Sequence, residues 1–143
     1  KLTCNVQAYF TANSTALTGN NYVHIVVLQD SIWGPQSNGK NYYPAMWDDS
    51  RPNNMRYCHN HMLREMPLGI DGENIGGNFK GNTYQKTFTY DIPLVISEED
   101  VVLPHLSVLV FITEGRPTVL DEYKNNKERV IYVTQSELIL TDE

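Results

Sequence analysis

Apolar and polar residues alternate with a period of two in two segments of the chain. In residues 2–10 the apolar positions of one face are Leu2, Cys4, Val6, Ala8 and Phe10. Residues 84–92 repeat the pattern, with Tyr84, Lys86, Phe88, Tyr90 and Ile92 on one face. Because successive side chains of a strand point to opposite sides, the alternation predicts two half-buried strands.

Two further segments, 22–29 and 106–113, are apolar on both faces. This pattern is typical of strands that lie inside a sheet, covered from both sides. We expect segments 2–10 and 22–29 to pair as a hairpin. Residues 129–140 are expected to hold the last strand or two, after a polar linker at 121–128.

The rest of the chain has weaker patterns. Residues 30–54 are interrupted by glycine and proline and predict a long loop. Segment 55–68 fits either a helix or a strand, and we favour a strand because Pro67 ends it and its surroundings are all-β. A glycine-rich connection at 69–81 follows, and Ser97 with Asp100 predicts one capped helical turn.

These elements amount to six to eight strands without a long helix that could join parallel strands. The predicted fold is therefore all-β, an antiparallel β-sandwich of immunoglobulin-like or jelly-roll type. A chain of 143 residues fits one such domain, spanning 1–143.

Composition narrows the range of partners. The formal net charge is −6 and the basic residues are scattered, which argues against nucleic acid and against an anionic membrane surface. The longest apolar run, at residues 25–28, is far shorter than the ~20 residues that span a bilayer. Abundant Asn, Thr, Tyr and Gly favour an extracellular setting. We expect the chain to be the C-terminal part of a longer exported protein, because it starts without a signal-peptide pattern.

Three stretches together carry a resemblance to a known family. They are 22–30 (YVHIVVLQD), 59–66 (HNHMLREM) and 106–112 (LSVLVFI). The chain, from Leu2 to about Leu140, resembles the twenty-eight-kilodalton outer-membrane lipoprotein family of Gram-negative anaerobes, in which such a domain follows a thioredoxin-like region. The resemblance implies a β-sandwich, attachment to the outer membrane through a lipid anchor upstream of this chain, and an adhesin-like or receptor-like role at the cell surface. It carries over no catalytic residue.

The two cysteines, Cys4 and Cys58, do not form a C-x-x-C motif, so the sequence has no dithiol redox site of that type. Cys4 belongs to an alternating strand pattern, which favours a buried core position over a lipidated one. A disulfide between Cys4 and Cys58 stays open, since geometry decides it.

Patterns for catalysis are weak. No recognised nucleophile motif is found, and adjacent carboxylates such as Asp48 and Asp49 point apart in an extended chain. We therefore expect no enzyme and no cofactor, with a jelly-roll hydrolase as an alternative. Calcium is conceivable at residues 48–50 and 71–74, although turn formation explains both with fewer assumptions.

Two histidines, His59 and His61, would lie on the same side of a strand and could share a metal ion. Two ligands are not a site, and a third would have to come from His24 or His105. Ordinary strand histidines are the simpler interpretation, so we predict no metal site.

The aromatic residues of the long loop are the best binding candidates. Aromatic side chains supply a large, rigid contact area that suits sugar faces or peptides. The predicted binding residues are Trp33, Tyr42, Tyr43 and Trp47. Some of these rings could instead cap the open end of the core. We expect a binding module, a candidate adhesin or receptor for a host protein, a matrix protein or a glycan. The alternative is a spacer that supports a thioredoxin-like neighbour, and rings packed inward would favour it.

Overall fold

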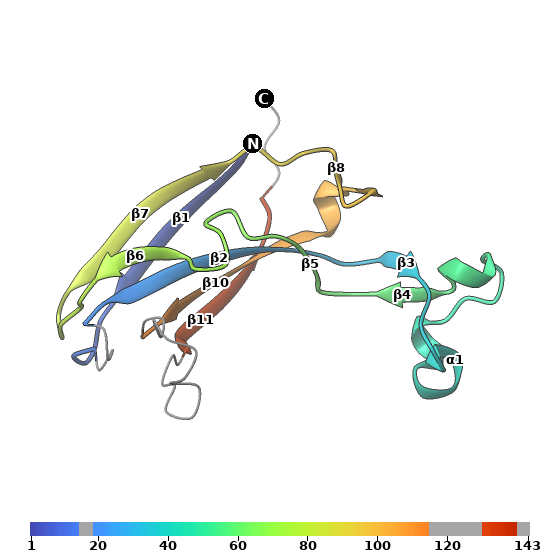
Figure 1. Ribbon diagram of the computed structural model, residues 1–143, viewed down its shortest axis with the longest axis horizontal. Helices are drawn as coiled ribbons and strands as arrows, with labels where there is room; N and C mark the ends of the chain where they lie inside the picture. The colour runs from blue at the N-terminus through green and yellow to red at the C-terminus, as the bar shows by residue number, and fades with distance from the viewer. Residues whose placement is uncertain (15–18, 115–129, 140–143) are drawn as a thin grey trace.

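The fold is built from antiparallel strands, as the computed structural model shows for residues 1–14, 19–114 and 130–139 (Figure 1). The predicted all-β class is confirmed. Among the described residues, seven strands have four residues or more, in agreement with the six to eight expected. The predicted linker at 121–128 lies outside the described residues.

Two layers of strands face each other. One is a ribbon of β1 (Leu2–Tyr9) and β7 (Thr83–Tyr90), paired in register from Leu2 opposite Tyr90 to Tyr9 opposite Thr83. The other is a five-stranded sheet with the order β11-β10-β2-β5, in which a further strand, β6, also pairs with β2. Its strands are β2 (Asn21–Gln29), β5 (Met62–Glu65), β6 (Glu73–Gly76), β10 (Leu106–Thr113) and β11 (Val130–Glu137).

The predicted hairpin of segments 2–10 and 22–29 is wrong. β1 pairs with β7, and β2 pairs with β10, β5 and β6. The two segments belong to different layers and meet face to face, which buries the apolar sides of both strands. The alternating pattern of β1 requires only that one face of the strand is buried, and this arrangement meets that requirement as well as a hairpin would.

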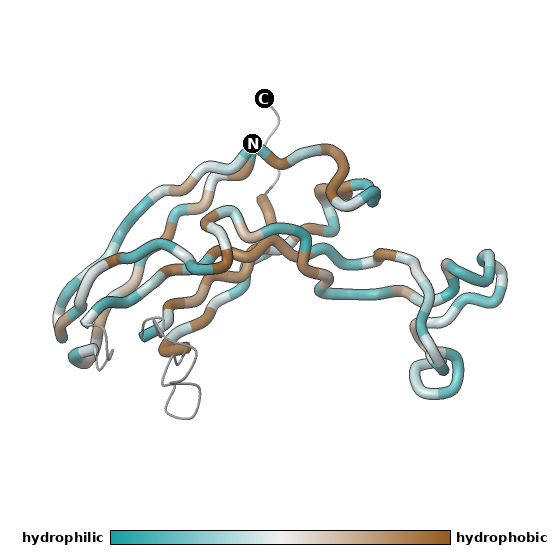
Figure 2. The backbone as a smooth tube through the Cα atoms, viewed as in Figure 1, coloured by the Kyte–Doolittle hydropathy of each residue, from teal (hydrophilic) through white to brown (hydrophobic). Residues whose placement is uncertain are grey.

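The hydrophobic core lies between the two layers. The ribbon contributes Leu2, Val6, Phe10 and Phe88, and the sheet contributes Val23, Ile25, Val27, Leu106, Val108 and Ile112. Figure 2 shows apolar residues concentrated along β2 and β10, the central strands of the sheet. The predicted inner faces of β1 and β7 are confirmed, because Cys4, Ala8, Tyr84 and Tyr90 also pack against this cluster.

The expected helical turn at Ser97 is wrong. Ser97 and Glu98 have φ angles of 51° and 65°, in the left-handed region. They connect β8 (Val95–Ile96) with β9 (Glu99–Asp100) as a two-residue hairpin loop. Positive φ at both central residues is the signature of a type I′ turn, and a right-handed helical turn excludes it.

The segment expected to be a long loop is partly ordered into short elements. It contains β3 (Ile32–Gly34), α1 (Gly39–Tyr42) and the 3₁₀ helices η1 (Pro44–Met46) and η2 (Asn53–Met55). The strand expected over 55–68 is divided into β4 (Tyr57–His59) and β5, because His61 adopts a φ of 56° between them. A third 3₁₀ helix, η3 (Leu103–His105), precedes β10.

Candidate binding surface

Residues 32–59 form a lobe that projects from one end of the sheet (Figure 1). We name it the aromatic lobe. Its stem is the pair β3–β4, with Trp33 opposite Cys58 and Gly34 opposite Tyr57. A further bridge joins Trp47 to Tyr57. The lobe is thereby tied to the ends of β2 and β5 through continuous backbone.

The two tryptophans are held by polar side chains of the lobe itself. The guanidinium carbon of Arg51 lies 3.7 Å from the centroid of the Trp33 ring, a cation–π arrangement. The same Arg51 is 3.4 Å from a carboxylate oxygen of Asp48. The indole nitrogen of Trp47 donates a hydrogen bond of 3.0 Å to Asp49. Both rings are half-buried and have a structural function in the lobe.

Asp49 joins three parts of the lobe. Besides the Trp47 indole, its carboxylate accepts a 2.6 Å hydrogen bond from Lys40 of α1 and lies 3.8 Å from Arg56. The hydrogen bond from Lys40, followed by that from Trp47, lowers the pKa of Asp49 below its usual value. The carboxylate is therefore ionised at neutral pH and connects α1 to the tryptophan.

The possible calcium loops are explained by turns and ion pairs. Asp48 accepts hydrogen bonds from the backbone nitrogen and the hydroxyl of Ser50, at 2.9 and 2.6 Å, which is an Asx turn. These bonds are the main reason why the pKa of Asp48 is lowered. In the second loop, Glu73 forms an ion pair with Lys86.

Two tyrosines, Tyr42 at the end of α1 and Tyr43 directly after it, are exposed. Tyr42 has 73 % of its surface accessible to solvent and Tyr43 has 59 %. Tyr43 meets Tyr57 edge to face at 6.4 Å, and Tyr57 in turn meets His59 at 4.8 Å. Gly39 permits this packing, because a Cβ there would lie 2.7 Å from the Tyr57 ring.

The four predicted binding residues thus lie in one lobe but differ in their surroundings. Trp33 and Trp47 pack against Arg51 and Asp49, whereas Tyr42 and Tyr43 face solvent. The alternative that these rings cap the core is wrong, because none belongs to the core cluster between the layers. Sequence reasoning missed Arg51 and Asp49, whose partners become visible only when the lobe is folded.

The predicted pair of histidines does not share one strand face. β4 ends at His59, whose ring nitrogen lies 3.2 Å from the carbonyl of Pro35. His61 follows the break and lies 3.7 Å from Asp30. Of the two candidate third ligands, His24 is buried in the sheet and stacks on Phe111, and His105 is the last residue of η3. Within the part of the chain that the structure describes, no three His, Cys, Asp or Glu side chains are grouped to hold a metal.

Both cysteines carry free thiols, so the possible disulfide is not formed. Cys4 lies on β1 opposite Phe88 and packs against the core, as expected. Burial raises the pKa of its thiol. Cys58 lies in the stem of the aromatic lobe, opposite Trp33.

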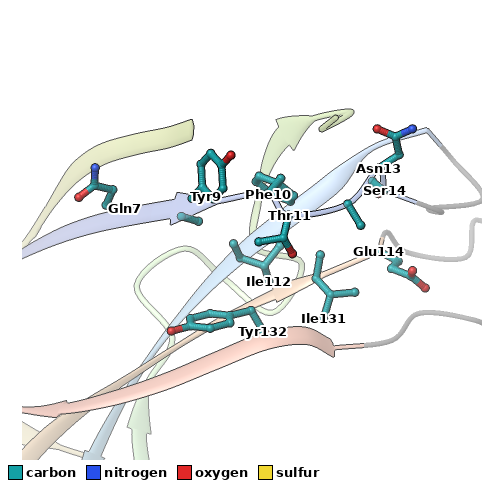
Figure 3. A pocket seen from close by; sticks show the side chains of 12 residues that line it. Gln7, Tyr9, Phe10, Thr11, Asn13, Ser14, Ile112, Glu114, Ile131 and Tyr132 are labelled. Carbon is teal, nitrogen blue, oxygen red and sulfur yellow. The ribbon is translucent and has the colours of Figure 1, made fainter. Parts of the chain in front are cut away.

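A cavity that sequence reasoning did not predict opens between the end of β1 and strands β10 and β11 (Figure 3). Its volume is about 470 Å³, within the range of small-molecule pockets. Phe10, Ile112 and Ile131 form apolar walls, and Gln7, Asn13 and Glu114 are among its polar residues. No local sequence pattern pointed to it, because its walls come from segments that are far apart along the chain.

Glu114 is the one carboxylate among the described residues that line the cavity, and it is buried. Apolar side chains, among them Phe10, Ile112 and Ile131, make up much of the remaining lining.

No helix among the described residues has the length and apolar character needed to cross a bilayer.

Comparisons with known proteins do not assign the chain to a family. Searches against protein-family models, curated proteins and solved structures gave no significant match.

Proposed function

We propose that this chain is a non-catalytic recognition module of an outer-membrane lipoprotein, exported to the cell surface, and that it binds its ligand through the aromatic lobe. The observation that carries the proposal is the exposure of Tyr42 and Tyr43 on a lobe whose other aromatic rings are held in place. Exposed aromatic rings on an ordered projection are typical of contact surfaces.

Rigidity of the lobe supports a role in binding. A tyrosine has few rotatable bonds, so it loses little conformational entropy when a ligand covers it. Tyr43 is further restricted by its edge-to-face contact with Tyr57. Asp49 links Lys40 to Trp47 and thereby holds α1 against the rest of the lobe. The surface is therefore largely formed before a ligand arrives.

The exposed amide side chains of the same lobe favour a glycan as the ligand. Four asparagines of the lobe have exposed side chains, namely Asn38, Asn41, Asn53 and Asn54. Side-chain amides both donate and accept hydrogen bonds, as the hydroxyl groups of sugars require. A tyrosine ring offers a flat apolar surface for the less polar face of a sugar ring. Host or matrix proteins that carry glycans are the corresponding partners.

Array binding tests the proposal. The chain, the double variant Tyr42→Ala/Tyr43→Ala and the control Phe79→Ala are applied to arrays of glycans and matrix proteins. Phe79 is a matched control because its ring is 64 % exposed but lies between β6 and β7, outside the lobe and outside the lining of the cavity. We expect signals for a restricted set of glycans, lost in the double variant and kept in Phe79→Ala. Equal profiles for all three proteins would contradict the site.

The spacer role is the competing explanation, and the packing of Trp33 and Trp47 within the lobe favours it. A spacer predicts no selective signal on any array. It also predicts that the tyrosine variants leave attachment of whole cells to immobilised glycans unchanged. Loss of attachment in the double variant alone would favour the binding module.

A further inference from the structure

The aromatic lobe is joined to the sheet by two crossings of the backbone, which interrupt the strand pairing at the same level. The pairing of β2 with β5 stops at Gln29, and the pairing of β3 with β4 begins at Ile32. Two residues on each strand lie between these two ladders. We name the four residues the junction: Asp30, Ser31, Asn60 and His61.

The backbone of the junction has the same unusual conformation on both strands. Ser31 has a φ of 62° and His61 has a φ of 56°, in the left-handed region that residues with a Cβ adopt rarely. Such residues are strained and persist where their surroundings hold them, often at the points about which a structure moves. The junction therefore needs contacts that hold it in place.

Two side chains supply these contacts, one from each strand. The carboxylate of Asp30 accepts a hydrogen bond of 2.6 Å from the backbone N–H of His61. The amide oxygen of Asn60 accepts a bond of 3.0 Å from the backbone N–H of Ser31. Asp and Asn side chains commonly accept backbone donors where a regular element is interrupted. Each strand thus fastens the strained residue of the other, and we name the two bonds the latch.

The two acceptors of the latch are anchored on different sides of the junction. Asp30 is fixed on the side of the sheet, because its backbone N–H donates a 3.0 Å bond to the carbonyl of His105. Asn60 is fixed on the side of the lobe, where its side chain lies 3.9 Å from the sulfur atoms of Met46 and Cys58. The latch therefore connects the sheet to the lobe.

Packing contributes little to the orientation of the lobe. Its elements lie mainly on one another, with β3 on β4 and η2, and with α1 and β4 on η1. None of residues 32–59 belongs to the core cluster or to the apolar residues packed against it. Asp30 is half-buried and the other residues of the junction are exposed, so water can replace the latch bonds when they open.

We propose that the junction is a latched hinge. While both latch bonds are closed, the lobe keeps the orientation seen in Figure 1. When both are open, the lobe turns as a unit about Ser31 and His61, since hinges are a few residues at the ends of elements that absorb changes in backbone angle. The use of this motion, to bring Tyr42 and Tyr43 to a ligand, rests on the proposed function, whereas the hinge itself is tested without a ligand.

Residual dipolar couplings of the backbone amides, measured in a weakly aligning medium, test the latch. In the wild type, the couplings of the lobe and of strands β2 and β10 are expected to fit one common alignment. Asp30→Ala/Asn60→Ala removes both acceptors. The couplings of the lobe should then fall to about half or less while those of β2 and β10 stay, because motion between orientations averages them. Asp30→Asn/Asn60→Asp is the matched control, since each new side chain keeps an acceptor oxygen, and it should behave like the wild type.

Three results would overturn the proposal. Lobe couplings that stay unreduced in the double alanine variant would show that the junction is rigid without the latch. Couplings already averaged in the wild type would show that the latch does not hold the lobe. A shift of tryptophan emission to longer wavelength in the double alanine variant would show that the lobe unfolds instead of turning. Asn60→Ala alone leaves the anchor on the sheet intact and should reduce the couplings less, so it provides the same test if the double variant does not fold.

The two proposals fail separately. Array signals that the Tyr42 and Tyr43 substitutions leave unchanged would contradict the ligand site without altering these couplings. Unreduced couplings would contradict the hinge without altering the array signals.

Discussion

The guanidinium of Arg51 stacks on the ring of Trp33, 3.7 Å from its centroid, and this contact joins the loop after η1 to the stem of the aromatic lobe. The chain contains two tryptophans, and both lie in the lobe. Intrinsic tryptophan fluorescence therefore reports on the lobe separately from the core between the strands.

Replacement of Arg51 by alanine is expected to loosen the lobe and to shift tryptophan emission to longer wavelength. The cation–π contact contributes about 0.5–1 kcal/mol at an exposed site, so the lobe should open while the β-core stays folded. Lys80→Ala removes a cation outside the lobe and should leave the emission unchanged. If Arg51→Ala leaves the emission spectrum as in the wild type, the stacking does not hold Trp33 in place.

His24 is expected to make stability depend on pH. It is 4 % exposed, stacks on Phe111 at 4.5 Å and lies 3.2 Å from the hydroxyl of Thr113. Burial lowers the pKa of its imidazole below 6.5. As pH falls below about 6.5, the unfolded chain takes up this proton before the folded chain does, so folding stability decreases with falling pH.

Thermal unfolding between pH 7.5 and 5.5 measures this effect. The wild type should lose stability by at most about 1.4 kcal/mol per pH unit from this group, and His24→Gln should lose markedly less. His105→Gln, at an exposed histidine, should behave like the wild type. Parallel pH profiles for the wild type and His24→Gln would show that His24 is not the group responsible.

Arg64 is expected to hold the β8–β9 hairpin against the sheet. One of its terminal nitrogens donates hydrogen bonds to the carbonyls of Ile96 and Glu99, each 2.9 Å long. Gln29 adds a bond of 3.1 Å to the carbonyl of Asp100. Arg64→Met keeps the aliphatic stem but removes both donors, at a local cost of about 1–3 kcal/mol.

Hydrogen–deuterium exchange should therefore become faster in residues 94–102 of Arg64→Met, with β2 and β10 unaffected. Lys80→Met provides the same type of substitution at an exposed cation. Unchanged exchange in the hairpin, or faster exchange throughout the sheet, would be inconsistent with a local role for Arg64.

Local patterns predicted the strands but not their partners. The alternation of residues 2–10 correctly placed Leu2, Val6 and Phe10 in the core. It could not show that β1 pairs with β7, because Leu2 lies opposite Tyr90, far along the chain. Pairing between distant segments depends on which faces of the folded layers meet, and a period of two carries no such information.

The sequence also predicted only part of the candidate site, because contacts between distant segments again decide the rest. Aromatic residues in a loop interrupted by glycine and proline indicated a contact surface near Tyr42 and Tyr43. The different environments of Trp33 and Trp47 depend on Arg51 and Asp49, which approach the rings only after the lobe folds. The cavity was not predicted, because its walls come from β1 and from β10 and β11, which are far apart in sequence.

Nuclear magnetic resonance mapping with a glycan captured on the array tests the central claim most directly. Amide shifts of the isotope-labelled chain are followed during titration with that glycan, for the wild type and for Tyr42→Ala/Tyr43→Ala. The account predicts that perturbed amides cluster in the aromatic lobe, residues 32–59, and that the double variant shows no saturable shifts. Shifts centred on the cavity between β1 and β11, or saturable shifts retained in the double variant, would contradict it.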